Sequence, residues 1–162
     1  MGRLLEINDL HFSFKTYGGT VKAVRGVTFH VDEGEIVGIV GESGCGKSVT
    51  AQCIVRLNPE PPGFFEGGSI IYKGTEMTSL SKKEIKKYQG SEIGFIFQDP
   101  MTSLNPTMKI GKQIEESIRN NTDLSKRQAK ERAIEMLNLV GIPNPEKRYY
   151  QYPHEFSGGM KQ

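Results

Sequence analysis

The segment from Gly41 to Ser48 has the clearest chemical meaning in this chain. It fits the pattern G-x-x-x-x-G-K-[ST] of a phosphate-binding loop. Glycines in such a loop let backbone N–H groups turn toward phosphate oxygens, and the following helix adds its positive N-terminal end. Lys47 would supply an ammonium to the β- and γ-phosphates, and Ser48 would supply a hydroxyl to Mg²⁺. The alternative is a glycine-rich turn that contains a lysine by chance. The eight residues are Gly41, Glu42, Ser43, Gly44, Cys45, Gly46, Lys47 and Ser48.

The flanking residues favour the functional interpretation. Residues 35–40 are an apolar run typical of a buried strand, and residues 49–57 have the composition of a helix. A strand before the loop and a helix after it are the context that a phosphate loop requires. We therefore predict nucleotide binding by the residues from Gly41 to Val49.

The cysteines and histidines predict neither a disulfide nor a metal site. A helical rise of 1.5 Å per residue separates the Cα atoms of Cys45 and Cys53 by about 12 Å. A disulfide needs less than about 7 Å. His11, His30 and His154 are scattered without ligand spacing.

Length and charge narrow the class of protein. A chain of 162 residues can form one domain with a sizeable core, and a net charge of +2 gives no indication of a nucleic-acid partner. No apolar stretch is long enough to span a membrane. Polar residues interrupt the N-terminal apolar run, so no signal peptide is predicted and a cytoplasmic location is expected.

Hydrophobic alternation predicts a strand-rich first part of the chain. A turn is expected at Tyr17-Gly18-Gly19, and the capping box that begins at Ser81 predicts a short helix. The predicted strands cover residues 4–14, 21–31, 68–72 and 92–97, in addition to the run before the loop.

After Pro106 the apolar period changes from two to 3.6 residues, which indicates helices. Ser125 is expected to cap a helix that Gly141 ends. The chain is therefore predicted to have an α/β fold, with a β-rich nucleotide-binding core over residues 1–106 and a helical subdomain over 107–162. The apolar faces that predict the two helices are Ile110, Ile114 and Ile118, and then Ala129, Ala133, Leu137 and Val140.

Three motifs occur in a fixed order: the phosphate loop, Phe97-Gln98 at a predicted strand end, and a Ser-Gly-Gly sequence within residues 156–162. In this order they resemble the ATP-binding subunits of ABC transporters, over the whole chain. A P-loop GTPase is disfavoured because no N-K-x-D guanine-recognition motif is found. Within the family the likeness is greatest to importers of dipeptides and oligopeptides, a branch that includes nickel importers. The segments that carry this likeness are 40–44, 61–63, 98–106 and 152–160.

The resemblance implies ATP and Mg²⁺ as cofactors and assigns roles to single residues. Phe14 takes the place of the aromatic that stacks on adenine, with Tyr17 as the second candidate and an ordinary strand aromatic as the alternative. Gln98 matches the residue whose amide approaches Mg²⁺ and the attacking water, so Ser48 and Gln98 are the expected metal ligands. The implied activity is ATP hydrolysis that drives uptake of peptides or a related solute.

The Ser157-Gly158-Gly159 sequence matches the family signature. In the family it faces the γ-phosphate bound to the opposite subunit, so two ATP-binding subunits are expected to pair head to tail. Transmembrane permease subunits are the other expected partners, at the cytoplasmic face of the membrane, and a solute-binding protein outside the cell is an indirect one.

Two departures from the family pattern are present. Phe156 and Met160 replace the commoner Leu and Gln, which fits the peptide branch. The chain stops at Gln162, so it is expected to be C-terminally incomplete and to lack the Mg²⁺-site aspartate, the catalytic glutamate and the switch histidine. The alternative function is therefore a nucleotide-binding fragment without turnover.

Overall fold

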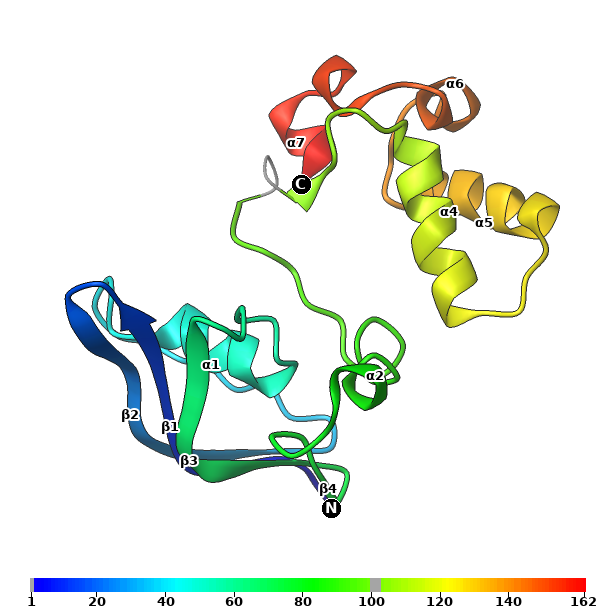
Figure 1. The fold of residues 1–162 in the computed structure, drawn as a ribbon. Coiled ribbons are helices and arrows are strands. Elements are labelled where there is room, and N and C mark those ends of the chain that lie inside the picture. The colour runs from blue at the N-terminus through cyan, green and yellow to red at the C-terminus, as the bar shows by residue number, and fades with distance from the viewer. Residues whose placement is uncertain (1, 100–102) are drawn as a thin grey trace. The chain divides into compact units, whose positions relative to one another are not determined.

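The computed structural model in Figure 1 describes residues 2–99 and 103–162. The chain divides into two compact units, Met1–Ile93 and Gly94–Gln162, and each is described by itself. The predicted boundary at Pro106 concerns the functional subdomains. It lies inside the second unit and stays a prediction.

An antiparallel sheet with the strand order β2-β1-β3-β4 forms the first unit. Its strands are β1 (Arg3–Thr16), β2 (Gly19–Asp32), β3 (Gly63–Tyr72) and β4 (Thr75–Glu76). The strands predicted over 4–14, 21–31 and 68–72 are confirmed. The first two are joined at the predicted turn, where Thr16 pairs with Gly19.

The buried positions of β1 switch from odd-numbered to even-numbered residues along the strand. Ile7 is fully buried and so is Leu10, three residues later. Asp9 between them has a φ of 45°, and the pairing with β2 shifts register there, which is the signature of a β-bulge. The bulge lets one strand keep apolar side chains on the same side over its whole length.

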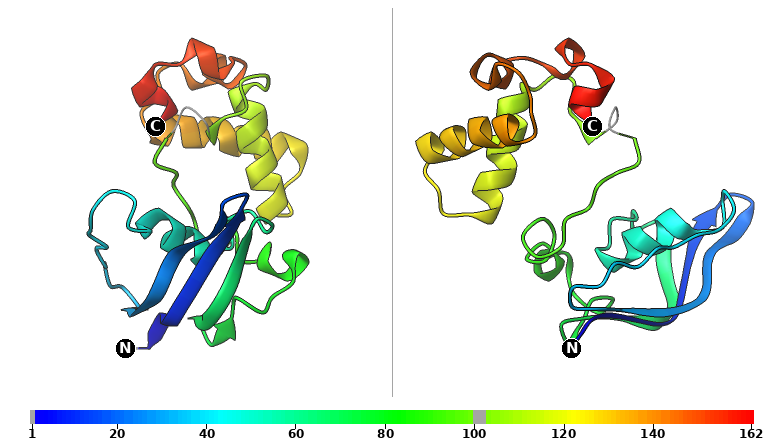
Figure 2. Two further views of the ribbon diagram at one scale, coloured as in Figure 1. Left: turned by 60° about the vertical axis from the view of Figure 1, so that its left-hand side comes forward. Right: turned by 180° about the vertical axis from the view of Figure 1, so that it is seen from behind.

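Helix α1 (Lys47–Ile54) covers one face of this sheet, as Figures 1 and 2 show. Cys53 of α1 is buried in the same cluster as Ile7, Phe12 and Ile70 of the sheet. Burial of this apolar area stabilises the unit and fixes the helix that follows the phosphate loop. Helix α2 (Lys82–Ile85) begins at the capping box of Ser81, as predicted.

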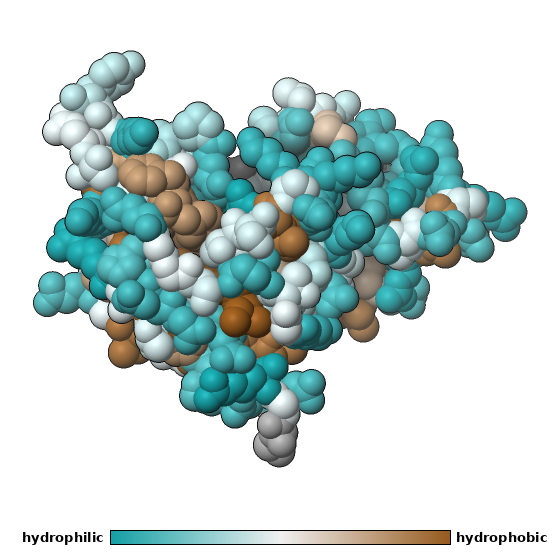
Figure 3. Space-filling view, turned by 60° about the horizontal axis from the view of Figure 1, so that its bottom comes forward, coloured by the Kyte–Doolittle hydropathy of each residue, from teal (hydrophilic) through white to brown (hydrophobic). Residues whose placement is uncertain are grey.

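Two predicted strands are absent from the structure. Residues 35–40 have no regular secondary structure, and Ile36 and Val40 are 97% and 92% exposed. Of residues 92–97, only Ile93 forms a single bridge, with Gln89. A strand exists only where a neighbour accepts and donates its backbone hydrogen bonds, and apart from the single Ile93 bridge no segment of the described chain pairs with these two. Apolar side chains such as Ile36, Val40 and Ile96 therefore remain at the surface. Figure 3 shows that one face of the molecule carries hydrophobic patches among hydrophilic residues.

The second unit is helical, as predicted. The Ser125 capping box that opens α5 is confirmed, and Gly141, with a φ of 77°, follows the helix end. Val140 does not belong to the buried face, since it is the C-cap residue and is 72% exposed, and Ile142 enters the core after the turn. The helices are α4 (Ile110–Asn121), α5 (Lys126–Leu139), α6 (Pro145–Tyr149), the 3₁₀ turn η1 (Pro153–Glu155) and α7 (Gly158–Lys161).

Helices α4 and α6 meet at a close contact. A Cβ atom at Gly111 of α4 would overlap the ring of Tyr149, which is only 2% exposed. The Tyr149 hydroxyl also donates a hydrogen bond to the buried carboxylate of Glu115 on α4. Glycine at position 111 is therefore required by the approach of an aromatic ring.

Candidate nucleotide-binding site

The phosphate loop lies against strand β2. Gly44 and Gly46 have φ values of 81° and 93°, in the left-handed region that favours glycine. A Cβ atom at Gly46 would also overlap the carbonyl oxygen of Ala23 on β2. Both the backbone conformation and the lack of space therefore demand glycine at position 46.

No side chain caps the backbone N–H groups at the start of α1. Gly46 is the N-cap residue and provides no side-chain acceptor, and the first turn contains no acidic residue. The Thr50 N–H and Thr50 Oγ1 donate to the Gly46 carbonyl at 2.8 and 3.0 Å, which holds the loop on the helix. A helix start of this kind favours an anion.

The Lys47 ammonium lies within the loop. Its Nζ donates to the carbonyl oxygens of Gly41 and Glu42 at 2.8 and 2.7 Å, and it lies 3.6 Å from Cys45 Sγ. An ammonium has three donors: two bind the carbonyls and the third binds the Cys45 sulfur, which is a weak acceptor that a phosphate oxygen would replace. Ser48 follows in the first turn of α1 and is exposed. These residues fit a bound nucleotide phosphate, with the Ser48 hydroxyl free to approach a metal ion.

The two aromatic candidates differ in exposure. Phe14 on β1 is half-buried and packs edge-to-face on Phe12, with ring centroids 5.2 Å apart. Tyr17 lies at the turn after β1 and is fully exposed. Phe14 thus packs partly against the core. Its role, and that of Tyr17, stays a prediction.

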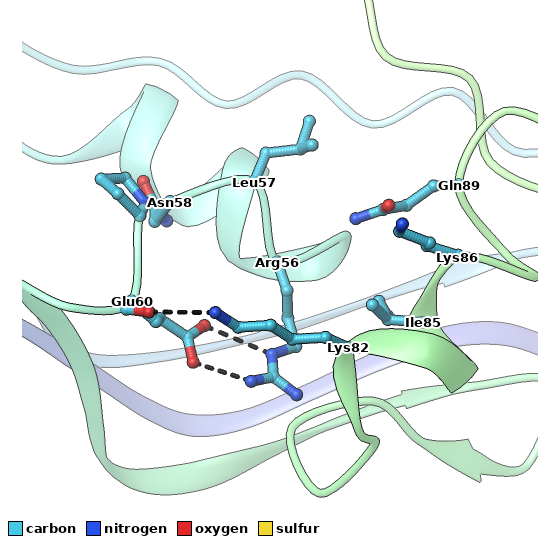
Figure 4. A pocket seen from close by; sticks show the side chains of 9 residues that line it. Arg56, Leu57, Asn58, Glu60, Lys82, Ile85, Lys86 and Gln89 are labelled. Carbon is cyan, nitrogen blue, oxygen red and sulfur yellow. Dashed lines mark hydrogen bonds and ion pairs between the residues drawn. The ribbon is translucent and has the colours of Figure 1, made fainter.

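A network of paired charges fixes the end of α1 (Figure 4). Arg56 is bound to the Glu60 carboxylate, at 2.7 and 3.2 Å from Nη2 and Nε, and it also donates to the Leu80 carbonyl. Lys82 Nζ approaches the Glu60 carbonyl at 3.4 Å. A pocket of about 310 Å³ lies here, but its arginine and glutamate bind one another. The arrangement serves to hold α1.

Cys53 is a neutral, buried thiol under this network. Burial raises its pKa to about 12, although a hydrogen bond from Asn58 opposes the shift. Asn58 also donates to the Val49 carbonyl at 3.1 Å, so it ties the segment after α1 back to the helix. Both cysteines, Cys45 and Cys53, are free.

The remaining predicted residues belong to the second unit. Gln98 is exposed and lies outside regular structure. Ser157 caps α7, where its Oγ accepts from the Met160 N–H at 3.3 Å, and Gly158 and Gly159 are exposed. The structure thus brings residues 41–49 together in the loop before α1 and the first turn of that helix, and residues 157–159 at the start of α7. In the predicted segment 98–106, residues 100–102 lie outside the described part of the chain.

Two residues that the sequence did not predict complete the setting of the loop. Thr50 lies four residues after Gly46, a spacing at which a threonine hydroxyl reaches back to a helix carbonyl, so a local signal existed. Ala23 contributes only its backbone carbonyl, and no local pattern indicates this contact.

Within residues 2–99 and 103–162, no group of three or more His, Cys, Asp or Glu side chains could hold a metal ion. Over the same residues, no helix has the length and apolar character needed to cross a membrane.

Residues 24–162 match the ABC transporter family. The match covers most of the chain, includes the phosphate loop described above, and ends in the Ser-Gly-Gly sequence. This chain belongs to the ABC transporter family.

Two relatives of this chain are named as ATP-binding proteins of peptide transport. The chain is 62% identical to the oligopeptide transport ATP-binding protein OppD of Bacillus subtilis (strain 168), over 99% of this chain and 45% of the relative. It is 50% identical to the dipeptide transport ATP-binding protein DppD of the same organism, over 100% of this chain and 48% of the relative. The chain therefore spans about half the length of the curated relatives it matches.

A solved structure confirms the fold class. The ATP-binding cassette MJ0796, in a dimeric post-hydrolysis state bound to ADP and Pi, superposes with a TM-score of 0.82. The similarity covers 97% of this chain and 65% of that one, at 23% sequence identity. The predicted α/β nucleotide-binding fold is thus that of an ATP-binding cassette.

Proposed function

We propose that this chain binds ATP with Mg²⁺ and forms part of the ATP-hydrolysing subunit of an importer for peptides or a related solute. The observation that carries the proposal is the position of Lys47. Its ammonium is held in the phosphate loop by the Gly41 and Glu42 carbonyls, beside a helix start that has no acidic residue. This is a ready site for the phosphates of a nucleotide.

The proposed roles are those that the resemblance to the family implies, and the exposure of Ser48, Gln98 and residues 157–159 is compatible with them. Backbone groups from Gly41 to Val49 bind phosphate, Ser48 and Gln98 approach Mg²⁺, and Gln98 orients the water. Phe14 stacks on the adenine, with Tyr17 as the alternative. The exposed Ser157-Gly158-Gly159 sequence contacts the nucleotide of a second ATP-binding subunit, so two subunits pair head to tail.

The transport assignment is supported by the relatives named for oligopeptide and dipeptide transport. We propose transmembrane permease subunits as partners at the cytoplasmic face of the membrane, with a solute-binding protein as an indirect partner outside the cell. That the 162-residue chain alone binds nucleotide without turnover stays a prediction, and phosphate release from the isolated chain measures it.

Uptake in cells tests the proposal. A strain that lacks the protein should lose uptake of labelled dipeptide or oligopeptide, and the wild-type protein should restore it. Restoration by Lys47→Ala at an equal protein level would contradict the role of the loop. Unchanged peptide uptake with lost nickel uptake would reassign the solute and keep the ATP-binding function.

A further inference from the structure

A second pocket, of about 470 Å³, lies within the helical unit between α4, α5 and α6. We call it the α4–α5–α6 pocket. Its volume is within the range of small-molecule sites. Four cationic side chains, two tyrosines and one glutamate line it: Lys112, Lys126, Arg127, Lys130, Tyr149, Tyr150 and Glu115.

The single carboxylate of the pocket is already engaged. Glu115 accepts hydrogen bonds from the Tyr149 hydroxyl and from Lys112 Nζ, the latter at 2.8 Å. Its side chain is only 5% exposed, whereas that of Lys112 is 46% exposed. The carboxylate of Glu115 is therefore paired with Lys112, and it forms no ion pair with Lys126 or Lys130.

Lys130 has aromatic partners in place of a carboxylate. Its Nζ donates to the Tyr150 hydroxyl at 2.7 Å and lies 5.6 and 5.2 Å from the ring centroids of Tyr149 and Tyr150. A neutral hydroxyl and two ring faces orient the ammonium without neutralising it. Two of its three N–H donors remain for a ligand.

The N-terminal turn of α5 adds to the excess of positive charge. A helix start favours negative groups, yet α5 begins with Lys126 and Arg127 and has no acidic residue in its first turn. Arg127 is paired with the exposed Glu131 at 3.0 Å. Lys126 is exposed and makes no ion pair or hydrogen bond within the described residues.

The contrast with the pocket beside α1 is informative. There Arg56 and Glu60 bind one another, so the pocket needs no further anion (Figure 4). In the α4–α5–α6 pocket, the ammonium groups of Lys126 and Lys130 both line the cavity, and neither forms an ion pair within the described residues. Tyr150 is 51% exposed, so the oriented ammonium of Lys130 lies beside a ring that solvent reaches.

We propose that the α4–α5–α6 pocket binds a polyvalent oxyanion. Two unpaired ammonium groups and the α5 N-terminus favour a ligand with at least two negative charges, because each contact then forms a charge-assisted hydrogen bond. Phosphate and carboxylate oxygens share this chemistry. The site is separate from the phosphate loop and does not depend on the proposed transport function.

Calorimetric titration of the full chain tests the proposal. The Lys47→Ala variant serves as the background, so that binding at the phosphate loop does not obscure the second site. Pyrophosphate and citrate represent the two possible sources of the oxyanion, at an ionic strength held constant with chloride. Lys126→Gln and Lys130→Ala, each in this background, should weaken binding of at least one probe about tenfold.

Arg132→Ala is the matched control, because it removes an exposed cation of the same helix that lies outside the pocket lining. It should leave binding unchanged, and circular dichroism should show that every variant is folded. A loss confined to pyrophosphate supports a phosphate ligand, and a loss confined to citrate supports a carboxylate ligand. Absence of binding by both probes, or an equal loss in Arg132→Ala, would overturn the proposal.

Discussion

Replacement of Lys47 by alanine is the most direct perturbation of the phosphate loop. In the structure the ammonium binds two loop carbonyls and the Cys45 sulfur, and the weak sulfur contact is the one that a phosphate oxygen would replace. A charge-assisted hydrogen bond contributes roughly 1.5–3 kcal/mol. Lys47→Ala should therefore weaken ATP binding about ten- to a hundredfold. The melting temperature should change little, because both carbonyls belong to exposed residues and water can replace the ammonium.

Titration of labelled ATP against the wild type, Lys47→Ala and Lys22→Ala measures this effect. Lys22 is an exposed lysine of β2 in the same unit and serves as the control for loss of one positive charge. Equal ATP affinities for the wild type and Lys47→Ala would refute the phosphate-loop assignment. A similar loss in Lys22→Ala would mean that net charge, and not the contact, determines affinity.

Four further outcomes are expected. Phe14→Ala should weaken ATP and ADP about equally in binding titrations, because adenine is common to both, and a loss for ATP alone would contradict stacking. Gly44→Ala should lower the free energy of unfolding, measured in urea, by about 1–2 kcal/mol, because alanine is strained in the left-handed region. Gly46→Ala should lower it by more, because only position 46 also lacks space for a Cβ atom. A thiol reagent at pH 8 should modify the exposed Cys45 at once and Cys53 only after unfolding, with reducing agent leaving the melting temperature unchanged. Burial raises the pKa of Cys53 from 9.0 to about 12, so above pH 9 the thiol ionises more readily in the unfolded chain than in the folded one. The contribution of Cys53 to stability should therefore be complete below about pH 9 and be lost as the pH rises toward 12, and unfolding curves at alkaline pH measure this loss.

Local patterns predicted the elements whose partners are close in the sequence. β1 and β2 form one hairpin, so alternation and a turn suffice to define them. The capping boxes of Ser81 and Ser125 involve residues only three positions apart. The turn before α1 was predictable for the same reason, since its glycines and the helix start are consecutive in the sequence.

Features that depend on distant segments were not predictable. Residues 35–40 have the composition of a buried strand. A strand forms only when a neighbouring strand pairs with it, and the composition of a segment does not indicate which segment that would be. The α4–α5–α6 pocket joins Lys112, Lys130 and Tyr149, which lie on three different helices. Gly46 contacts the backbone carbonyl of Ala23, and because every residue has such a carbonyl, the residue type at position 23 does not predict the contact.

The close approach of α4 and α6 has an evolutionary consequence. Gly111 has no room for a Cβ atom because the ring of Tyr149 occupies that space, and the same ring borders Lys130. A larger residue at 111 would be compatible only with a smaller one at 149, and that exchange would also remove one aromatic face from Lys130. Positions 111, 149 and 130 should therefore change together among homologous sequences, as one inherited unit.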